Sequence, residues 1–85
     1  KLPTVSDASG EYDLSYLDVT PITAINGSVT LTFSSTADNM YVNGEKVTSA
    51  KTETYQVAAG ATKYVQVITQ TGTESPYVTV LKITR

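Results

Sequence analysis

Apolar and polar residues alternate along most of this chain, which is the pattern of strands that bury one face of a sheet. The clearest case is Val29, Leu31 and Phe33, which are separated by threonines and should point into a core. Apolar residues at helical spacing do not recur over any useful length, so we expect essentially no helix. Shorter alternating or apolar runs occupy 12–16, 40–42, 55–57, 64–69 and 77–84.

Turn-forming residues separate these runs at short intervals. Asn26-Gly27 and Asn43-Gly44 favour positive φ at both central positions, so the second pair predicts a type I′ hairpin after Val42. Further turns are expected at Ala59-Gly60 and across 70–76. About seven short strands with such regular turns predict an all-β fold, an immunoglobulin-like antiparallel β-sandwich with Greek-key connections.

The first quarter of the chain is less regular. Residues 1–11 are rich in turn formers and predict either a lead-in segment or a short edge strand. The alternation at 12–16 then changes phase, which predicts a strand with a β-bulge between Tyr16 and Leu17. Pro21 should end that strand or lie at an edge of the sheet, because proline has no backbone N–H to donate.

The 85 residues are enough for one domain and for a thin core. We therefore treat 1–85 as a single β-sandwich domain. Its core is expected to contain the inward-facing residues of the predicted strands: Leu14, Val29, Leu31, Phe33, Val42, Val57, Val65, Val67, Leu81 and Ile83.

The composition argues against catalysis and cofactors. There is no His and no Cys, which removes the most common general base, thiolate nucleophiles and disulfides. The acidic residues Asp13, Asp18, Glu45, Glu53 and Glu74 are interpreted as solvated strand and turn residues. We expect no enzyme activity, no catalytic residues and no cofactor.

Metal binding and covalent modification have weak signals. Several loop carboxylates could supply oxygen ligands for Ca²⁺, but no Asp-x-Asp-x-Asp-Gly loop is present, so no metal site is assigned. Asn26-Gly27-Ser28 matches the N-glycosylation sequon, although Asn-Gly is first of all a turn. An intramolecular isopeptide bond has its residue types present but no diagnostic motif.

The charge pattern excludes two kinds of partner. The formal net charge is −2, and the six basic residues are scattered along the chain. Nucleic-acid binding needs clustered Lys and Arg, so no nucleic-acid partner is expected. No apolar run approaches the roughly 20 residues of a membrane helix, so no membrane insertion is expected.

The six tyrosines provide the main alternative to a purely structural role. Aromatic rings exposed on a β face can stack on sugar rings, and Tyr41, Tyr55 and Tyr64 form the candidate ligand surface. The competing interpretation is that most tyrosine rings are buried with their hydroxyls in water. No Trp is present to strengthen the case for polysaccharide binding.

Residues 12–85 resemble the cadherin-like β-sandwich modules of large bacterial secreted and cell-surface proteins. The resemblance rests on the segments SVTLTFSS, TADNMYVNGEKV, VAAGATKYVQVITQTGTESPY and YVTVLKITR. It implies an immunoglobulin-like spacer or accessory module beside catalytic or binding domains, and it carries over no catalytic residues.

The sequence therefore predicts a non-catalytic module of a multi-modular, secreted or cell-surface bacterial protein. It would serve as a spacer, a stabiliser or an interaction domain. Its partners would be neighbouring domains of the same polypeptide, another surface protein or a polysaccharide. The alternative is a carbohydrate-binding module that uses exposed tyrosines.

Overall fold

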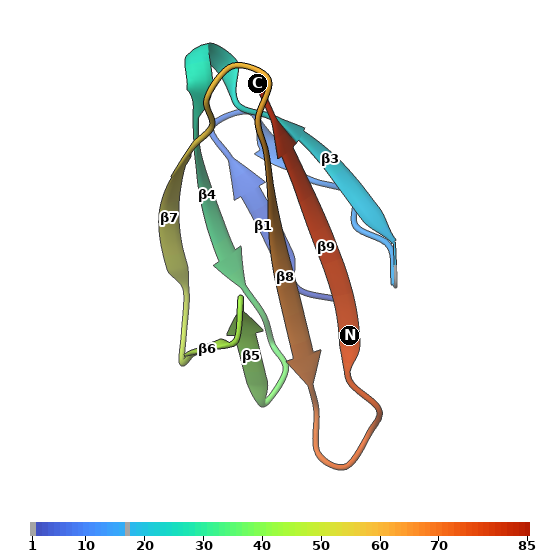
Figure 1. Ribbon diagram of the computed structural model, residues 1–85. Coiled ribbons are helices and arrows are strands. Elements are labelled where there is room, and N and C mark those ends of the chain that lie inside the picture. The colour runs from blue at the N-terminus through green and yellow to red at the C-terminus, as the bar shows by residue number, and fades with distance from the viewer. Residues whose placement is uncertain (1, 17) are drawn as a thin grey trace.

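The computed structural model describes residues 2–16 and 18–85, and these residues form two β-sheets packed face to face (Figure 1). One sheet has four strands in the order β2-β1-β4-β7, and the other has five in the order β3-β9-β8-β5-β6. This arrangement confirms the predicted all-β sandwich. The strands are β1 (Thr4–Asp7), β2 (Gly10–Glu11), β3 (Val19–Thr23), β4 (Ser28–Ser34), β5 (Asn39–Val42), β6 (Glu45–Val47), β7 (Lys51–Gln56), β8 (Thr62–Gln70) and β9 (Tyr77–Thr84).

A single 3₁₀ turn, η1 (Ile25–Gly27), is the helical structure of the described residues. None of their helices is long and apolar enough to cross a membrane.

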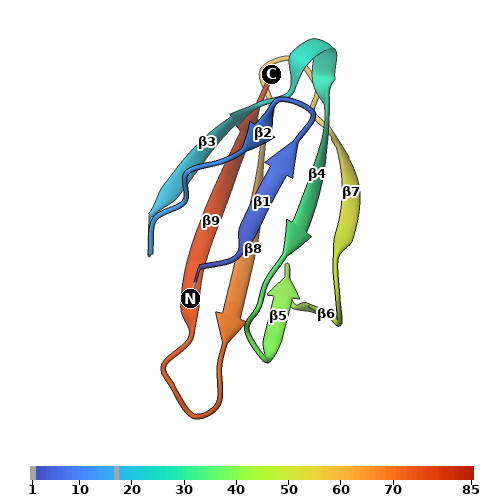
Figure 2. The same ribbon diagram turned by 180° about the vertical axis from the view of Figure 1, so that it is seen from behind.

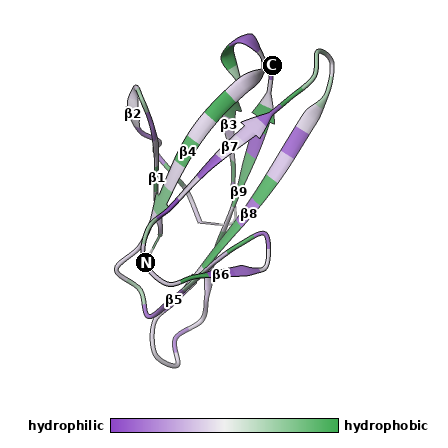
Figure 3. Cartoon of the chain, turned by 90° about the vertical axis from the view of Figure 1, so that its left-hand side faces the viewer, coloured by the Kyte–Doolittle hydropathy of each residue, from purple (hydrophilic) through white to green (hydrophobic). Residues whose placement is uncertain are grey.

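The core lies between the sheets and follows from the alternation along the strands. On β4, Val29, Leu31 and Phe33 are buried while the intervening threonines face outward (Figure 3). On the facing sheet, Val65 and Val67 of β8 are fully buried. The predicted core is confirmed except for Leu14, which is only partly buried and packs against the cluster from its side. Other members of the cluster are Val5, Ile22, Ala24 and Met40.

The two Asn-Gly turns have different roles. Asn43 and Gly44 both have positive φ, 50° and 81°, and join β5 to β6 with Val42 paired to Glu45. The predicted two-residue type I′ hairpin is therefore confirmed. Asn26 and Gly27 also have positive φ, but they connect β3 of the five-stranded sheet to β4 of the four-stranded sheet.

The N-terminal third contributes strands to both sheets. β1 pairs with β4 and β2, so the outer strand on that side is the two-residue β2. β3 pairs in parallel with β9, which departs from a purely antiparallel sandwich. Pro21 is inside β3, which is an edge strand of the five-stranded sheet. Of the two predicted positions, the end of a strand and the edge of a sheet, the structure shows the edge.

The predicted strand at 12–16 is wrong. Tyr12 donates its backbone N–H to Val5 O at 2.8 Å, but residues 12–16 join neither sheet. Tyr12 and Leu14 alternate with exposed residues because both pack against the side of the core, without a partner strand. The predicted bulge between Tyr16 and Leu17 involves Leu17, which lies outside the described residues.

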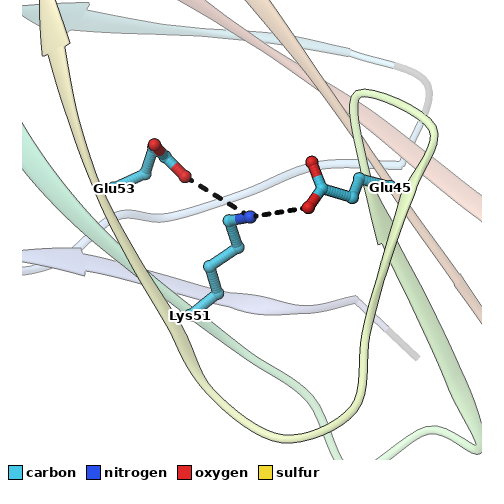
Figure 4. A network of polar contacts seen from close by, with 3 residues as sticks. All are labelled: Glu45, Lys51 and Glu53. Atoms are coloured by element: carbon cyan, nitrogen blue, oxygen red, sulfur yellow. Dashed lines mark hydrogen bonds and ion pairs between the residues drawn. The ribbon is translucent and has the colours of Figure 1, made fainter.

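A salt bridge connects β7, an edge strand of the four-stranded sheet, to β6, an edge strand of the five-stranded sheet. Lys51 Nζ lies 3.4 Å from Glu45 Oε1 and 3.4 Å from Glu53 Oε2 (Figure 4). The hydrogen bond that Lys51 donates to Glu45 is the main cause that raises the Lys51 pKa above its ordinary value. Charged side chains in such positions discourage an edge strand from pairing with another chain.

One buried hydroxyl should lower the stability of the native state. Thr79 on β9 is fully buried, and its Oγ1 has no hydrogen-bond partner among the described residues. Because valine has the same shape without the polar atom, Thr79→Val should stabilise the fold by about 1 kcal/mol. Chemical denaturation measures the difference. Thr62→Val, at an exposed position of β8, is the control, and an equal gain in both variants would refute the role of the buried hydroxyl.

The two turn asparagines offer a matched pair for a second test. Asn43 Oδ1 accepts the Gln66 backbone N–H at 2.8 Å, whereas the Asn26 side chain makes no hydrogen bond within the described parts of the chain. Both residues have positive φ, so replacement by alanine introduces similar backbone strain. Asn43→Ala should therefore cost about 1 kcal/mol more than Asn26→Ala in thermal or chemical unfolding. Equal losses would show that the side-chain bond to β8 contributes nothing.

Candidate functional site

Two of the three predicted ligand tyrosines lie on the outer face of the five-stranded sheet. Tyr64 on β8 precedes the buried Val65, so its ring points outward, and it is 57% exposed. Tyr41 on β5 lies between two buried residues and therefore faces the same way, opposite Ile68. These two rings share a face but not a strand.

Tyr55 lies elsewhere. It is on β7 of the other sheet, partly buried against the core, with its ring 6.4 Å from the Phe33 ring in an edge-to-face arrangement. Burial, followed by the nearby Glu53 charge, raises the Tyr55 pKa to about 12. The structure therefore does not bring Tyr41, Tyr55 and Tyr64 together on one surface, and a ligand role for them stays a prediction.

The loop carboxylates bind backbone groups of their own loops or of neighbouring loops. Asp7 accepts the Ser9 N–H at 2.7 Å, and Asp38 accepts the Gly72 N–H at 2.8 Å. Asp18 likewise accepts the N–H of the next residue. Across residues 2–16 and 18–85, no three His, Cys, Asp or Glu side chains gather as a metal site would require.

A different pair of tyrosines meets at the start of β9. The rings of Tyr16 and Tyr77 are 5.1 Å apart between centroids, with an interplanar angle of 70°. Together with Glu74, Ser75 and Pro76 they line an open pocket of about 380 Å³. Tyr16 is half exposed although it is in contact with another aromatic ring. This pocket combines two aromatic surfaces with a carboxylate and a hydroxyl.

The parallel pairing of β3 with β9 explains this meeting. Val19 pairs with Val80, and Val80 N–H donates to Asp18 O at 3.2 Å. Just before this pairing the chain turns, with the Asp18 N–H donating to Ser15 O at 3.4 Å, and Tyr16 in this turn contacts Tyr77, the first residue of β9. The two residues are far apart in the sequence, so the strand order alone makes them neighbours.

Sequence analysis missed this pair. Tyr16 was assigned to a strand at 12–16, and Tyr77 was placed only within the run at 77–84. No local pattern indicates that β3 pairs in parallel with β9. Only the folded chain brings the two rings together.

A second concave region lies near the β1–β2 turn. Asp7, Ser9, Thr23 and Ile25 are shared by two adjacent open grooves, the larger of about 510 Å³. The Asp7 carboxylate is already occupied, because it accepts hydrogen bonds from the Ser9 N–H and the Tyr12 hydroxyl. This region therefore serves to close the turn rather than to offer a free charged group.

The comparisons with known proteins add no relative. Neither protein-family models, nor curated proteins, nor solved structures gave a match to this chain.

The Asp7–Tyr12 contact predicts a pH dependence. The Tyr12 hydroxyl, and next the Ser9 N–H, hold the pKa of Asp7 below its ordinary 3.8. A carboxylate whose pKa is lower in the folded state stabilises the fold above the unfolded-state pKa, and that contribution is lost as the pH falls through the folded-state value. Asp7→Asn should therefore show a weaker loss of stability than the native chain below about pH 4.

The measurement is the free energy of unfolding, determined by denaturant titration at several acidic pH values. Asp13→Asn is the matched control, because Asp13 is exposed and makes no hydrogen bond within residues 2–16 and 18–85. If both variants follow the acid dependence of the native chain, the Asp7–Tyr12 contact does not contribute to stability.

Proposed function

We propose that this chain is a non-catalytic structural or accessory module of a multi-modular secreted or cell-surface bacterial protein. It would act as a spacer or as a stabilising and interacting neighbour of other domains. The observation that carries the proposal is its shape, a sandwich of 41 × 22 × 21 Å. The chain ends at the top of the long axis, and the first described residues lie beside the lower half of β9 (Figure 2). Flanking domains would then be held apart along the long axis of the sandwich.

The strand order supports an immunoglobulin-like interpretation. One sheet carries β1, β2, β4 and β7, and the other carries β3, β5, β6, β8 and β9, so the chain passes repeatedly from one sheet to the other, as in Greek-key sandwiches. Modules of this type are used as rigid units because each buries its own core. The cadherin-like resemblance remains part of this proposal and rests on the sequence segments alone.

The outer face of the four-stranded sheet suits a surface that stays in water. Threonines on β4 and β7 face each other across the strands, with Oγ1 atoms 2.9 Å apart for Thr30 and Thr54. Thr32 and Thr52 form the next pair at 3.1 Å. Hydroxyls paired in this way cover the sheet with polar groups and leave little apolar area for non-specific association.

The outer face of the five-stranded sheet is the better candidate for contact with another domain. Val19 is 48% exposed at its edge and pairs with Val80, and Tyr64 is exposed on β8. Apolar side chains left outward on a sheet are typical of surfaces that meet a partner. A neighbouring domain or another surface protein is the proposed partner.

The alternative function, carbohydrate binding through Tyr41, Tyr55 and Tyr64, has less support. These residues lie on two sheets, and the Tyr55 ring packs on the core. Sugar binding would need a different set of aromatic residues.

The spacer role predicts a narrow distance distribution. The chain would be placed between two copies of a small rigid domain, each carrying one spin label, and the distance measured by pulsed electron spin resonance. A flexible Gly/Ser linker of equal length has an average end-to-end distance of about 50 Å, close to the long axis of the sandwich, so the mean does not discriminate. The width of the distance distribution discriminates between the two. A single narrow peak supports the spacer role, and a distribution as broad as that of the flexible linker would refute it.

A further inference from the structure

The pocket at the start of β9 has the features of a small-ligand site. Its volume of about 380 Å³ lies at the lower end of the range for ligand pockets. The Tyr16 ring is half exposed, although its contact with Tyr77 would bury it further in a purely structural role. Aromatic area and polar groups are therefore available on the same concave surface.

The loop that carries the polar groups is held in place by its own hydrogen bonds. Glu74 N–H donates to Thr71 O at 3.1 Å, and Gln70 Nε2 donates to Glu74 O at 3.3 Å. These bonds use the backbone of Glu74, and no hydrogen bond within the described residues uses its carboxylate. Glu74 lines the same pocket as the two tyrosines, and its carboxylate is available to a ligand.

We propose that this pocket, formed by Tyr16, Glu74, Ser75, Pro76 and Tyr77, binds a neutral saccharide. One face of a pyranose ring presents C–H groups that are apolar and weakly positive, and the face of a tyrosine ring carries negative charge. The hydroxyls at the rim of such a sugar donate to a carboxylate in charge-assisted hydrogen bonds. Tyr16 provides the stacking surface, and Glu74 with Ser75 provides the polar contacts.

The charge of the pocket favours neutral sugars over acidic sugars. Glu74 is the only Asp, Glu, Lys or Arg among the five lining residues. An acidic sugar would place a second negative charge near this carboxylate without a basic residue to offset it. A neutral sugar has no such penalty.

A proline-rich peptide is the competing ligand, because aromatic-lined grooves also bind polyproline helices. Such ligands lie along an extended groove across several aromatic residues. Here Tyr16 and Tyr77 meet edge to face at 70° and form one short pocket. That geometry favours one or two sugar rings over an extended peptide.

The spacer proposal does not depend on this site, and the two are tested separately. The binding test is affinity electrophoresis of the isolated chain through gels that contain neutral glucan, xylan, mannan or galactan, with polygalacturonate as the acidic comparison. Retardation is expected in at least one neutral gel. Tyr16→Ala should weaken that binding by at least about tenfold, the change that corresponds to 1.4 kcal/mol.

Tyr64→Ala is the matched control, because Tyr64 has a similar exposure but lies on the outer face of the five-stranded sheet. This variant should keep the retardation of the native chain. Glu74→Gln provides a second variant that retains the side-chain shape and should weaken binding without altering the aromatic surface. Unfolding midpoints of all three variants show whether each is folded.

Several outcomes would overturn the proposal. These are no retardation in any neutral gel, retardation only by polygalacturonate, or binding that is lost in Tyr64→Ala but kept in Tyr16→Ala. A fluorescence titration with a proline-rich peptide covers the competing ligand. If that peptide binds in a Tyr16-dependent way while no sugar does, the pocket is a peptide site.

Discussion

The parallel pairing of β3 with β9 is the constraint on which the rest of the structure depends. Parallel strands cannot be joined by a tight turn, so a long crossover connection must separate them in the sequence. Here the crossover between them contains β4 to β8, which contribute to both sheets, and Ile22 of β3 lies opposite Ile83 of β9. The Ala24 N–H donates to Thr84 O at 2.7 Å and fixes the end of this pairing. The first and last quarters of the chain are thereby joined at one edge.

Each edge of the two sheets is limited in its own way. Pro21 removes a donor from β3, and β2 and β6 are short. The longest edge strand is β7, and it carries Lys51 and Glu53 with the lysine held between two carboxylates. Features of this kind lower the tendency of open sheets to pair with other chains. They are consistent with a module that must remain separate from identical neighbours.

The sequence was most informative where local pattern alone decides the structure. The alternation of Val29, Leu31 and Phe33 determines which face of β4 is buried, and Asn43-Gly44 determines a two-residue hairpin whatever surrounds it. The alternation at 12–16 was misleading because side chains that pack on the edge of a core show the same period as a strand. The parallel β3–β9 register, and with it the Tyr16–Tyr77 pocket, depends on a non-local choice between strand partners, which no short segment specifies.

The positions of the tyrosines show why exposure alone does not define a binding site. Tyr64 is slightly more exposed than Tyr16, yet it lies on the outer sheet face and does not line the pocket that Tyr16 shares with Tyr77. Tyr16 lies in a concavity because its ring contacts Tyr77 at the start of β9, next to the loop that carries Glu74. The pocket is at one edge of the sandwich, away from the threonine-covered face. The proposed spacer role uses the long axis of the sandwich and the proposed ligand its side, so neither proposal requires the other.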